Sequence, residues 1–242
     1  MFEFTIVCKG NSQILNNIHS SLKPIIENLE GIVIKHCNEL SFAVKNQHSE
    51  FLKPVLAELI SENIVNFYKY QFLSQNIMLN IKNRFTYKSF LQSLVVFDAQ
   101  TDSEIIKKNL VLDRKINIDS FYLFQLFDLR SRWLDIAMVV NESMPIILKD
   151  KSLAQLTQYF VSATTTRVEE LHIYGKGKQI WLEIDGKECD LVFDDSVTAV
   201  ENIVIEAISL NPKKIYLHGH LPNYQLLNSK LQSVFSDKIF SL

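Results

Sequence analysis

Hydrophobic and polar residues alternate at the start of the chain in a pattern that predicts strands on both sides of a helix. The segment FEFTIVC, residues 2–8, has the period of two that is typical of a β-strand. Residues 11–29 carry apolar side chains at helical spacing after Asn11 or Ser12 as the N-cap, and we expect Pro24 to kink or end this helix. Residues 31–46 predict a β-hairpin that turns at Asn38–Glu39. The first fifty residues therefore predict the order strand, helix, strand, strand.

From residue 51 to about residue 163 the apolar residues follow helical spacing. The pattern is strongest between Asp119 and Asn141, where apolar side chains occupy more than one face of the predicted helix. They are Phe121, Phe124, Leu126, Phe127, Leu129, Trp133, Leu134, Ile136, Ala137 and Val140. We expect this segment to be one central helix surrounded by the other helices. The alternative is that part of its surface is an exposed patch that binds a partner.

Residues 164–242 return to a mixture of strands and helices. Asp185–Gly186 is a two-residue turn of the kind that closes a β-hairpin, and Thr198 with Glu201 has the spacing of a capping box at a helix start. Strand, helix, strand, helix, strand then follow, which predicts parallel strands joined by right-handed crossovers.

The three regions together predict an α+β (mixed α/β) fold. A βαββ region (residues 1–50), a helical segment (51–163) and an α/β region (164–242) are expected to form one compact unit. The C-terminal region should contain a mixed sheet with a hairpin and βαβ crossovers.

The composition narrows the classes of function. The chain has 25 Lys and Arg residues against 27 Asp and Glu, and this balance does not favour nucleic-acid binding. Three scattered cysteines without Cys-x-x-Cys spacing argue against a disulfide framework and a zinc ribbon. No secretion signal or membrane span is evident, so we expect a cytoplasmic protein. The sequence indicates no metal and no cofactor, and a protein partner is the interaction it leaves open.

A candidate site lies at the end of the strand KKIYLH. His218 and His220 flank a glycine, and side chains two residues apart on a strand face the same side, so both imidazoles could meet one ligand. Asp194, after another predicted strand, could complete such a site, because open α/β sheets bind ligands at the carboxyl ends of parallel strands. We favour the structural alternative, in which a strand-end histidine forms a hydrogen bond with a loop.

Other segments carry no recognised catalytic motif. Residues 175–178, GKGK, lack the spacing of a phosphate-binding loop and are followed by a predicted strand, so we interpret them as a hairpin turn. The sequence has no nucleophile elbow, zinc-protease motif or dinucleotide fingerprint. These observations favour a protein that is not an enzyme.

Residues 117–240 carry a family resemblance. The runs NIDSFYLFQLFDLRSRWLDIAMVV, SLAQLTQYFVSA and NPKKIYLHG resemble, in order and spacing, the YtxC-like family of sporulation-associated proteins from endospore-forming bacteria. Gln125 stands where the family usually has Arg, and Ser152–Leu153 replaces an acidic-aromatic pair. The matched positions are mostly apolar, so the resemblance implies a setting, spore formation, and no reaction.

Together these observations predict a cytoplasmic, sporulation-associated protein that acts through protein contacts. The alternative from the residues themselves is an enzyme, or a protein that binds a metal or small ligand, using His218, His220 and Asp194.

Overall fold

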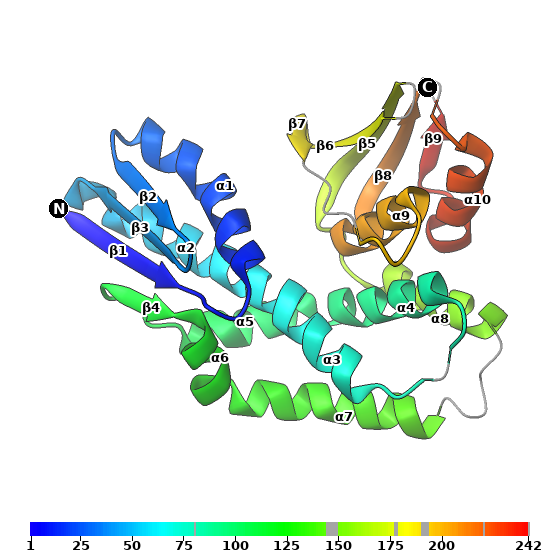
Figure 1. Cartoon of the computed structure of the whole chain (residues 1–242), viewed down its shortest axis with the longest axis horizontal. Coiled ribbons are helices and arrows are strands. Elements are labelled where there is room, and N and C mark those ends of the chain that lie inside the picture. The colour runs from blue at the N-terminus through cyan, green and yellow to red at the C-terminus, as the bar shows by residue number, and fades with distance from the viewer. Residues whose placement is uncertain (80, 144–149, 177–178, 190–193, 220, 242) are drawn as a thin grey trace. The chain divides into compact units, whose positions relative to one another are not determined.

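A computed structural model describes residues 1–79, 81–143, 150–176, 179–189, 194–219 and 221–241 (Figure 1). Their contacts divide the chain into two compact units instead of the single unit expected. Unit 1 comprises residues 1–76 and 99–138, and unit 2 comprises residues 77–98 and 139–242. The predicted helical segment 51–163 is shared between them, so the three expected regions do not map one to one onto the two units.

Unit 1 contains a four-stranded sheet in the order β2-β3-β1-β4. Its strands are β1 (Phe2–Val7), β2 (Ile32–His36), β3 (Glu39–Val44) and β4 (Lys115–Asn117). The β2–β3 hairpin and the β1–β3 pair are antiparallel, whereas β4 pairs with β1 in parallel. The strand β4 was not predicted from the sequence, because three residues are too few to show an alternating pattern.

The helices of unit 1 bury apolar faces at the positions that the sequence pattern indicates. They are α1 (Ser12–Asn28), η1 (Asn46–His48), α2 (Ser49–Asn63), the π-helix η2 (Ile64–Lys69), α3 (Tyr70–Asn76), α5 (Ala99–Asn109), α6 (Ile118–Gln125) and α7 (Phe127–Ser143), of which residues 127–138 belong to this unit. The Asn11 side chain caps α1 by accepting a hydrogen bond from the Gln13 N–H, and the helix continues through Pro24 to Asn28.

The predicted central helix is in fact two helices, and the expectation that it is buried on all sides was wrong. The chain breaks between α6 and α7 at Leu126, where Arg130 donates a hydrogen bond of 2.8 Å to the Leu123 carbonyl at the end of α6. This bond satisfies one of the carbonyls that a helix end leaves without a partner. One set of apolar side chains enters the core, and another set faces solvent. Buried are Phe121, Leu126, Leu129, Trp133, Ala137 and Val140; exposed are Phe124, Phe127 and Leu134.

Unit 2 contains a five-stranded mixed sheet in the order β7-β6-β5-β8-β9. The strands are β5 (Val168–Lys176), β6 (Gln179–Ile184), β7 (Lys187–Cys189), β8 (Pro212–His218) and β9 (Ile239–Ser241). The predicted antiparallel hairpins are confirmed. The strands at Lys214 and Lys238 are parallel to their sheet neighbours, as expected: β8 pairs with β5 and β9 pairs with β8. Asp185 and Gly186 both have positive φ, as the two-residue turn requires. Of the turn expected at residues 175–178, Gly175 and Lys176 belong to β5, and residues 177 and 178 lie outside the described residues.

One face of this sheet packs against helices to form the core of unit 2. The helices of the unit are α4 (Arg84–Phe97), α8 (Asp150–Ala163), α9 (Ala199–Leu210) and α10 (Tyr224–Phe235). Leu171, Ile173, Ile215 and Leu217 on the sheet belong to one buried cluster with the apolar faces of α9 and α10. The predicted capping box of Thr198 and Glu201 starts α9. Helices and two mixed sheets together make the chain an α+β protein, as the sequence predicted.

Candidate functional site

The two described residues of the site predicted from the sequence have different partners. His218 lies at the end of β8 with its Nε2 atom 2.7 Å from Nδ1 of His172 on β5. Asp194 forms an ion pair with Lys88 of α4 and accepts a hydrogen bond from the Ser196 N–H. These hydrogen bonds, above all the one from Lys88, lower the pKa of Asp194 to about 2. Among the described residues, His218 and Asp194 share no hydrogen bond or ion pair. His220 lies outside the described residues.

His218 belongs to a row of stacked rings on the face of the unit 2 sheet that does not carry the buried cluster. Its ring stacks on Tyr174 at 4.3 Å between centroids and on His172 at 5.0 Å. Trp181 extends the row beyond Tyr174, and Tyr216 extends it beyond His172. This row of rings was not predicted, although the segments LHIYG and IYLHG carry the sequence pattern that indicates it. In each, His and Tyr are two residues apart, and the parallel register pairs Tyr174 with His218 and His172 with Tyr216.

The stacked row predicts a pH dependence of stability. Burial, and the charge of His172, lower the pKa of His218, while Glu183 opposes this. Below the ordinary pKa of about 6.5, the unfolded chain therefore binds more protons at this position than the folded chain does. The free energy of unfolding should fall as the pH drops through this window. We expect His218→Gln to make stability less dependent on pH between 7.5 and 5.5.

Urea unfolding at the two pH values measures the effect, with His36→Gln, a change at an exposed histidine on β2, as the control. An equal pH dependence in the wild type and in His218→Gln would contradict the assignment.

The described residues offer no cluster for a metal ion: nowhere in them do three or more His, Cys, Asp or Glu side chains come together in a suitable group.

A second candidate site lies in unit 1, where Asp119 at the start of α6 holds the loop between β1 and α1. Its carboxylate accepts hydrogen bonds from the Lys9 N–H at 2.7 Å, the Gly10 N–H at 3.2 Å and the Tyr68 hydroxyl at 2.6 Å. Burial raises the pKa of Asp119, but these hydrogen bonds outweigh it and hold the pKa below its ordinary value. A Cβ atom at Gly10 would lie 2.6 Å from Asp119 Oδ1, so this close approach requires glycine.

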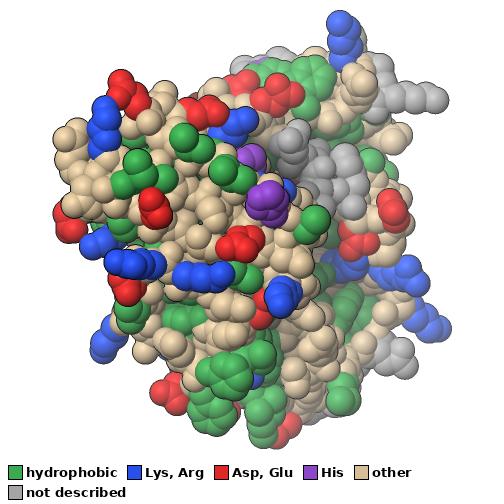
Figure 2. Space-filling model, turned by 60° about the vertical axis from the view of Figure 1, so that its left-hand side comes forward, with side chains coloured by type: hydrophobic (Ala, Val, Ile, Leu, Met, Phe, Trp, Pro, Cys, Tyr) green, Lys and Arg blue, Asp and Glu red, His purple; other side chains and the backbone are tan. Residues whose placement is uncertain are grey.

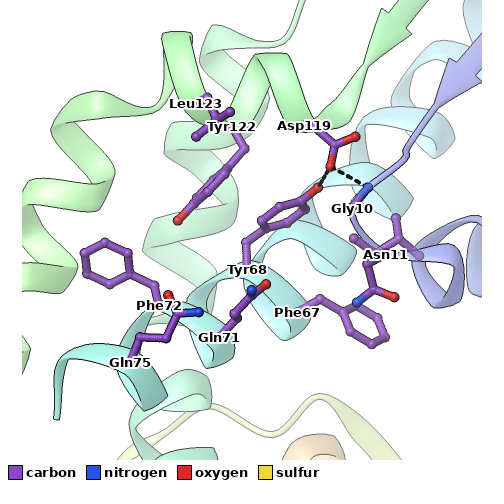
Figure 3. A pocket seen from close by; sticks show the side chains of 11 residues that line it. Gly10, Asn11, Phe67, Tyr68, Gln71, Phe72, Gln75, Asp119, Tyr122 and Leu123 are labelled. Carbon is purple, nitrogen blue, oxygen red and sulfur yellow. Dashed lines mark hydrogen bonds between the residues drawn. The ribbon is translucent and has the colours of Figure 1, made fainter. Parts of the chain in front are cut away.

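A cavity of about 210 Å³ opens beside this carboxylate (Figure 3). It is lined from three directions: by the start of α1, by η2 and α3, and by α6. The lining side chains are mainly aromatic rings and amides, namely Asn11, Phe67, Tyr68, Gln71, Phe72, Gln75, Asp119, Tyr122 and Leu123. The rings of Tyr68 and Tyr122 contact each other with their centroids 4.4 Å apart.

Residues that line the cavity pack against Trp133, which is hydrogen-bonded to a buried ion pair. Lys69, the last residue of the π-helix, is fully buried, and its Nζ atom lies 2.7 Å from Oδ2 of Asp102 on α5. The same oxygen accepts a hydrogen bond of 3.0 Å from Trp133 Nε1 on α7. Trp133 in turn packs against Phe72 and Tyr122, which line the cavity. A π-helix is rare and is frequently found at functional sites.

The polar groups of this site suit binding better than proton transfer. Cys8 lies 3.7 Å from the Tyr68 hydroxyl, and burial raises the pKa of its thiol. Burial and the hydrogen bond to Asp119 raise the pKa of Tyr68. Both groups therefore stay protonated near neutral pH, and neither supplies a reactive anion. Sequence patterns could not reveal this site, because its parts come from three segments that are far apart along the chain.

A third feature is an apolar surface on α6 and α7, which we call the α6–α7 surface. It consists of five exposed side chains: Leu123 (48%), Phe124 (79%), Phe127 (68%), Leu134 (41%) and Met138 (49%). Figure 2 shows hydrophobic side chains gathered at the lower edge of that view, with acidic side chains beside them. Apolar side chains that gather on a surface are typical of sites that bind another protein.

Comparisons of the chain with protein-family models, with curated proteins and with solved structures found no match. The resemblance to the YtxC-like family therefore stays a prediction. Within the described residues, no helix has the length and apolar character needed to span a membrane.

Proposed function

We propose that this chain is a cytoplasmic, sporulation-associated protein that acts by contacting another protein through the α6–α7 surface. The observation that carries the proposal is the exposure of Phe124 and Phe127, two large aromatic side chains that solvent would normally disfavour. The setting comes from the resemblance of residues 117–240 to the YtxC-like family. The absence of a recognised catalytic motif from the sequence supports a contact role.

The spacing along α7 indicates what the surface binds. Phe127, Leu134 and Met138 are seven and four residues apart, so they form one stripe along the helix, as in helix-to-helix contacts. Asp128 and Asp135, both exposed and also seven residues apart, run beside this stripe. The occupant that fits is an amphipathic helix of a partner protein whose apolar stripe is bordered by Lys or Arg.

A second copy of this chain fits less well. If two α7 helices paired antiparallel about a two-fold axis, the same flank of each helix would face its counterpart. The acidic row of Asp128 and Asp135 would then oppose itself, and like charges in direct opposition are destabilising. Beside Asp128 and Asp135, charge complementarity therefore favours a basic partner helix, although the Arg130 guanidinium also borders the stripe, 6.0 Å from the centroid of the Phe127 ring.

Complementation of a gene deletion tests the proposal. In an endospore-forming bacterium that carries this gene, we expect the deletion to reduce the number of heat-resistant spores. The double variant Phe124→Ser/Phe127→Ser should fail to restore that number although its melting temperature is close to that of the wild type, because both rings are exposed.

The matched control is Phe51→Ser, which removes another exposed ring in unit 1, on α2. It should restore spore formation fully. Normal spore numbers in the deletion strain would overturn the proposed setting. Equal complementation by the double variant and by the control would show that the α6–α7 surface is not the contact.

A further inference from the structure

The cavity of unit 1 has the size of a site for one small ring system. An apolar cavity of about 150 Å³ accommodates benzene, so a cavity of about 210 Å³ has room for two fused rings. Its aromatic walls come from different elements, with Phe72 on α3 and Tyr122 on α6. Figure 3 shows Tyr122 pointing from α6 towards the helix that carries Gln71, Phe72 and Gln75. A planar molecule between these elements would contact rings and amides together.

Polar groups at the cavity have hydrogen-bonding capacity left for a ligand. Gln71 and Gln75 are exposed at the mouth of the cavity, and among the described residues their side-chain amides and the Tyr122 hydroxyl form no hydrogen bond with other protein groups. Each amide offers one acceptor and two donors in a plane. Amides recognise purine bases in this way, because their donor and acceptor match the paired acceptor and donor on the edge of adenine.

The charge of the side chains that line the cavity disfavours anionic ligands. The described residues that line the cavity include no Lys, Arg or His, and the one charged side chain among them is Asp119. Hydrogen bonds hold the carboxyl of Asp119 in its charged form, so the site carries negative charge at neutral pH. Asp119 would repel a phosphate or carboxylate group on the ligand, and the described lining side chains supply no counter-charge; the guanidinium of Arg130, which does not line the cavity, lies 5.4 Å from the centroid of the Tyr122 ring.

We propose that the cavity beside Asp119 binds an uncharged purine-type base, which stacks on the ring of Phe72 and is read by the amides of Gln71 and Gln75. Stacking of a base on an aromatic side chain is tolerant of sequence and substituents, whereas the amides supply selectivity for a ring that has both donors and acceptors. This ligand site is separate from the protein contact at the α6–α7 surface, and neither proposal requires the other.

Isothermal titration calorimetry on the full chain tests the ligand site, with adenine and hypoxanthine as probes. We expect at least one of the two bases to bind, and Gln71→Leu and Gln75→Leu each to weaken its binding about tenfold, the effect of losing one amide-to-base contact. Gln125→Leu is the matched control, since it removes an exposed amide on α6 outside the cavity and should leave binding unchanged.

Two further probes distinguish a purine-type base from an apolar ring of similar size and from a nucleotide. Indole has nearly the same size but lacks the acceptors of a purine, so it should bind more weakly than the base. Adenosine 5′-monophosphate should bind no more tightly than adenine, because the negative charge of Asp119 repels its phosphate. The proposal is overturned if neither base binds, if both glutamine variants bind like the wild type, or if indole or the nucleotide binds more tightly than the base.

Discussion

Replacing Lys69 by Met should lower the free energy of unfolding of unit 1 by about 3–5 kcal/mol. The side chains of Lys69 and Asp102 are 0% and 2% exposed, and 2.7 Å separates Nζ from Oδ2. Removing the ammonium leaves a buried carboxylate without its counter-charge, which costs far more than the pair contributes when it is intact. Urea unfolding followed by circular dichroism measures the loss.

The double variant Lys69→Met/Asp102→Leu distinguishes this cause from a general packing defect. Because it removes both charges, it should recover a large part of the stability lost in the single variant. Trp133 would lose its acceptor in the double variant, so full recovery is not expected. A double variant that is less stable than Lys69→Met would contradict the assignment of the loss to an uncompensated buried charge.

The burial of Lys69 could not be predicted from the sequence. A lysine next to the apolar stripe of a predicted helix is normally assigned to solvent, because lysine is almost never buried without a partner. Its partner, Asp102, lies 33 residues later on a different helix. The π-helix that turns Lys69 inwards adds a residue to one turn, which an analysis based on a period of 3.6 residues does not detect.

Features that depend on neighbouring residues were predicted well. The turn at Asp185–Gly186 follows from two residues that tolerate positive φ, and the capping box needs only Thr198 and Glu201 three positions apart. The parallel pairing of β8 with β9 follows from the one helix, α10, that lies between them in the chain. In each case the physical cause is local or depends on one crossover.

Features that depend on register or tertiary contact were not predicted. The contact between His172 and His218 was not predicted, because the two residues are 46 positions apart in the sequence and only the parallel register of β5 and β8 brings them together. The cavity beside Asp119 needs three separate segments to meet. The end of α6 at Leu126 has no proline or glycine to mark it, and it depends on Arg130 reaching back to a carbonyl.

Alanine at Trp133 and alanine at Phe124 should have opposite outcomes, although both residues belong to the segment predicted to be one buried helix. Trp133 is fully buried, packs against Phe72 and Tyr122, and donates a hydrogen bond to Asp102. Trp133→Ala should therefore lower the free energy of unfolding by about 3–5 kcal/mol. Phe124 is 79% exposed, and Phe124→Ala should change it by about 0.5 kcal/mol or less.

Urea unfolding of both variants, monitored by circular dichroism, separates the two cases. The comparison also tests whether this segment is buried on more than one face, because nine residues at about 100° each would place Phe124 opposite Trp133 even on a continuous helix. If Phe124→Ala lost as much stability as Trp133→Ala, both rings would belong to the core and the α6–α7 surface would not exist as described. A large loss at Trp133 with little change at Phe124 is the result expected when the face that carries Trp133 lies in the core and Phe124 is exposed to solvent.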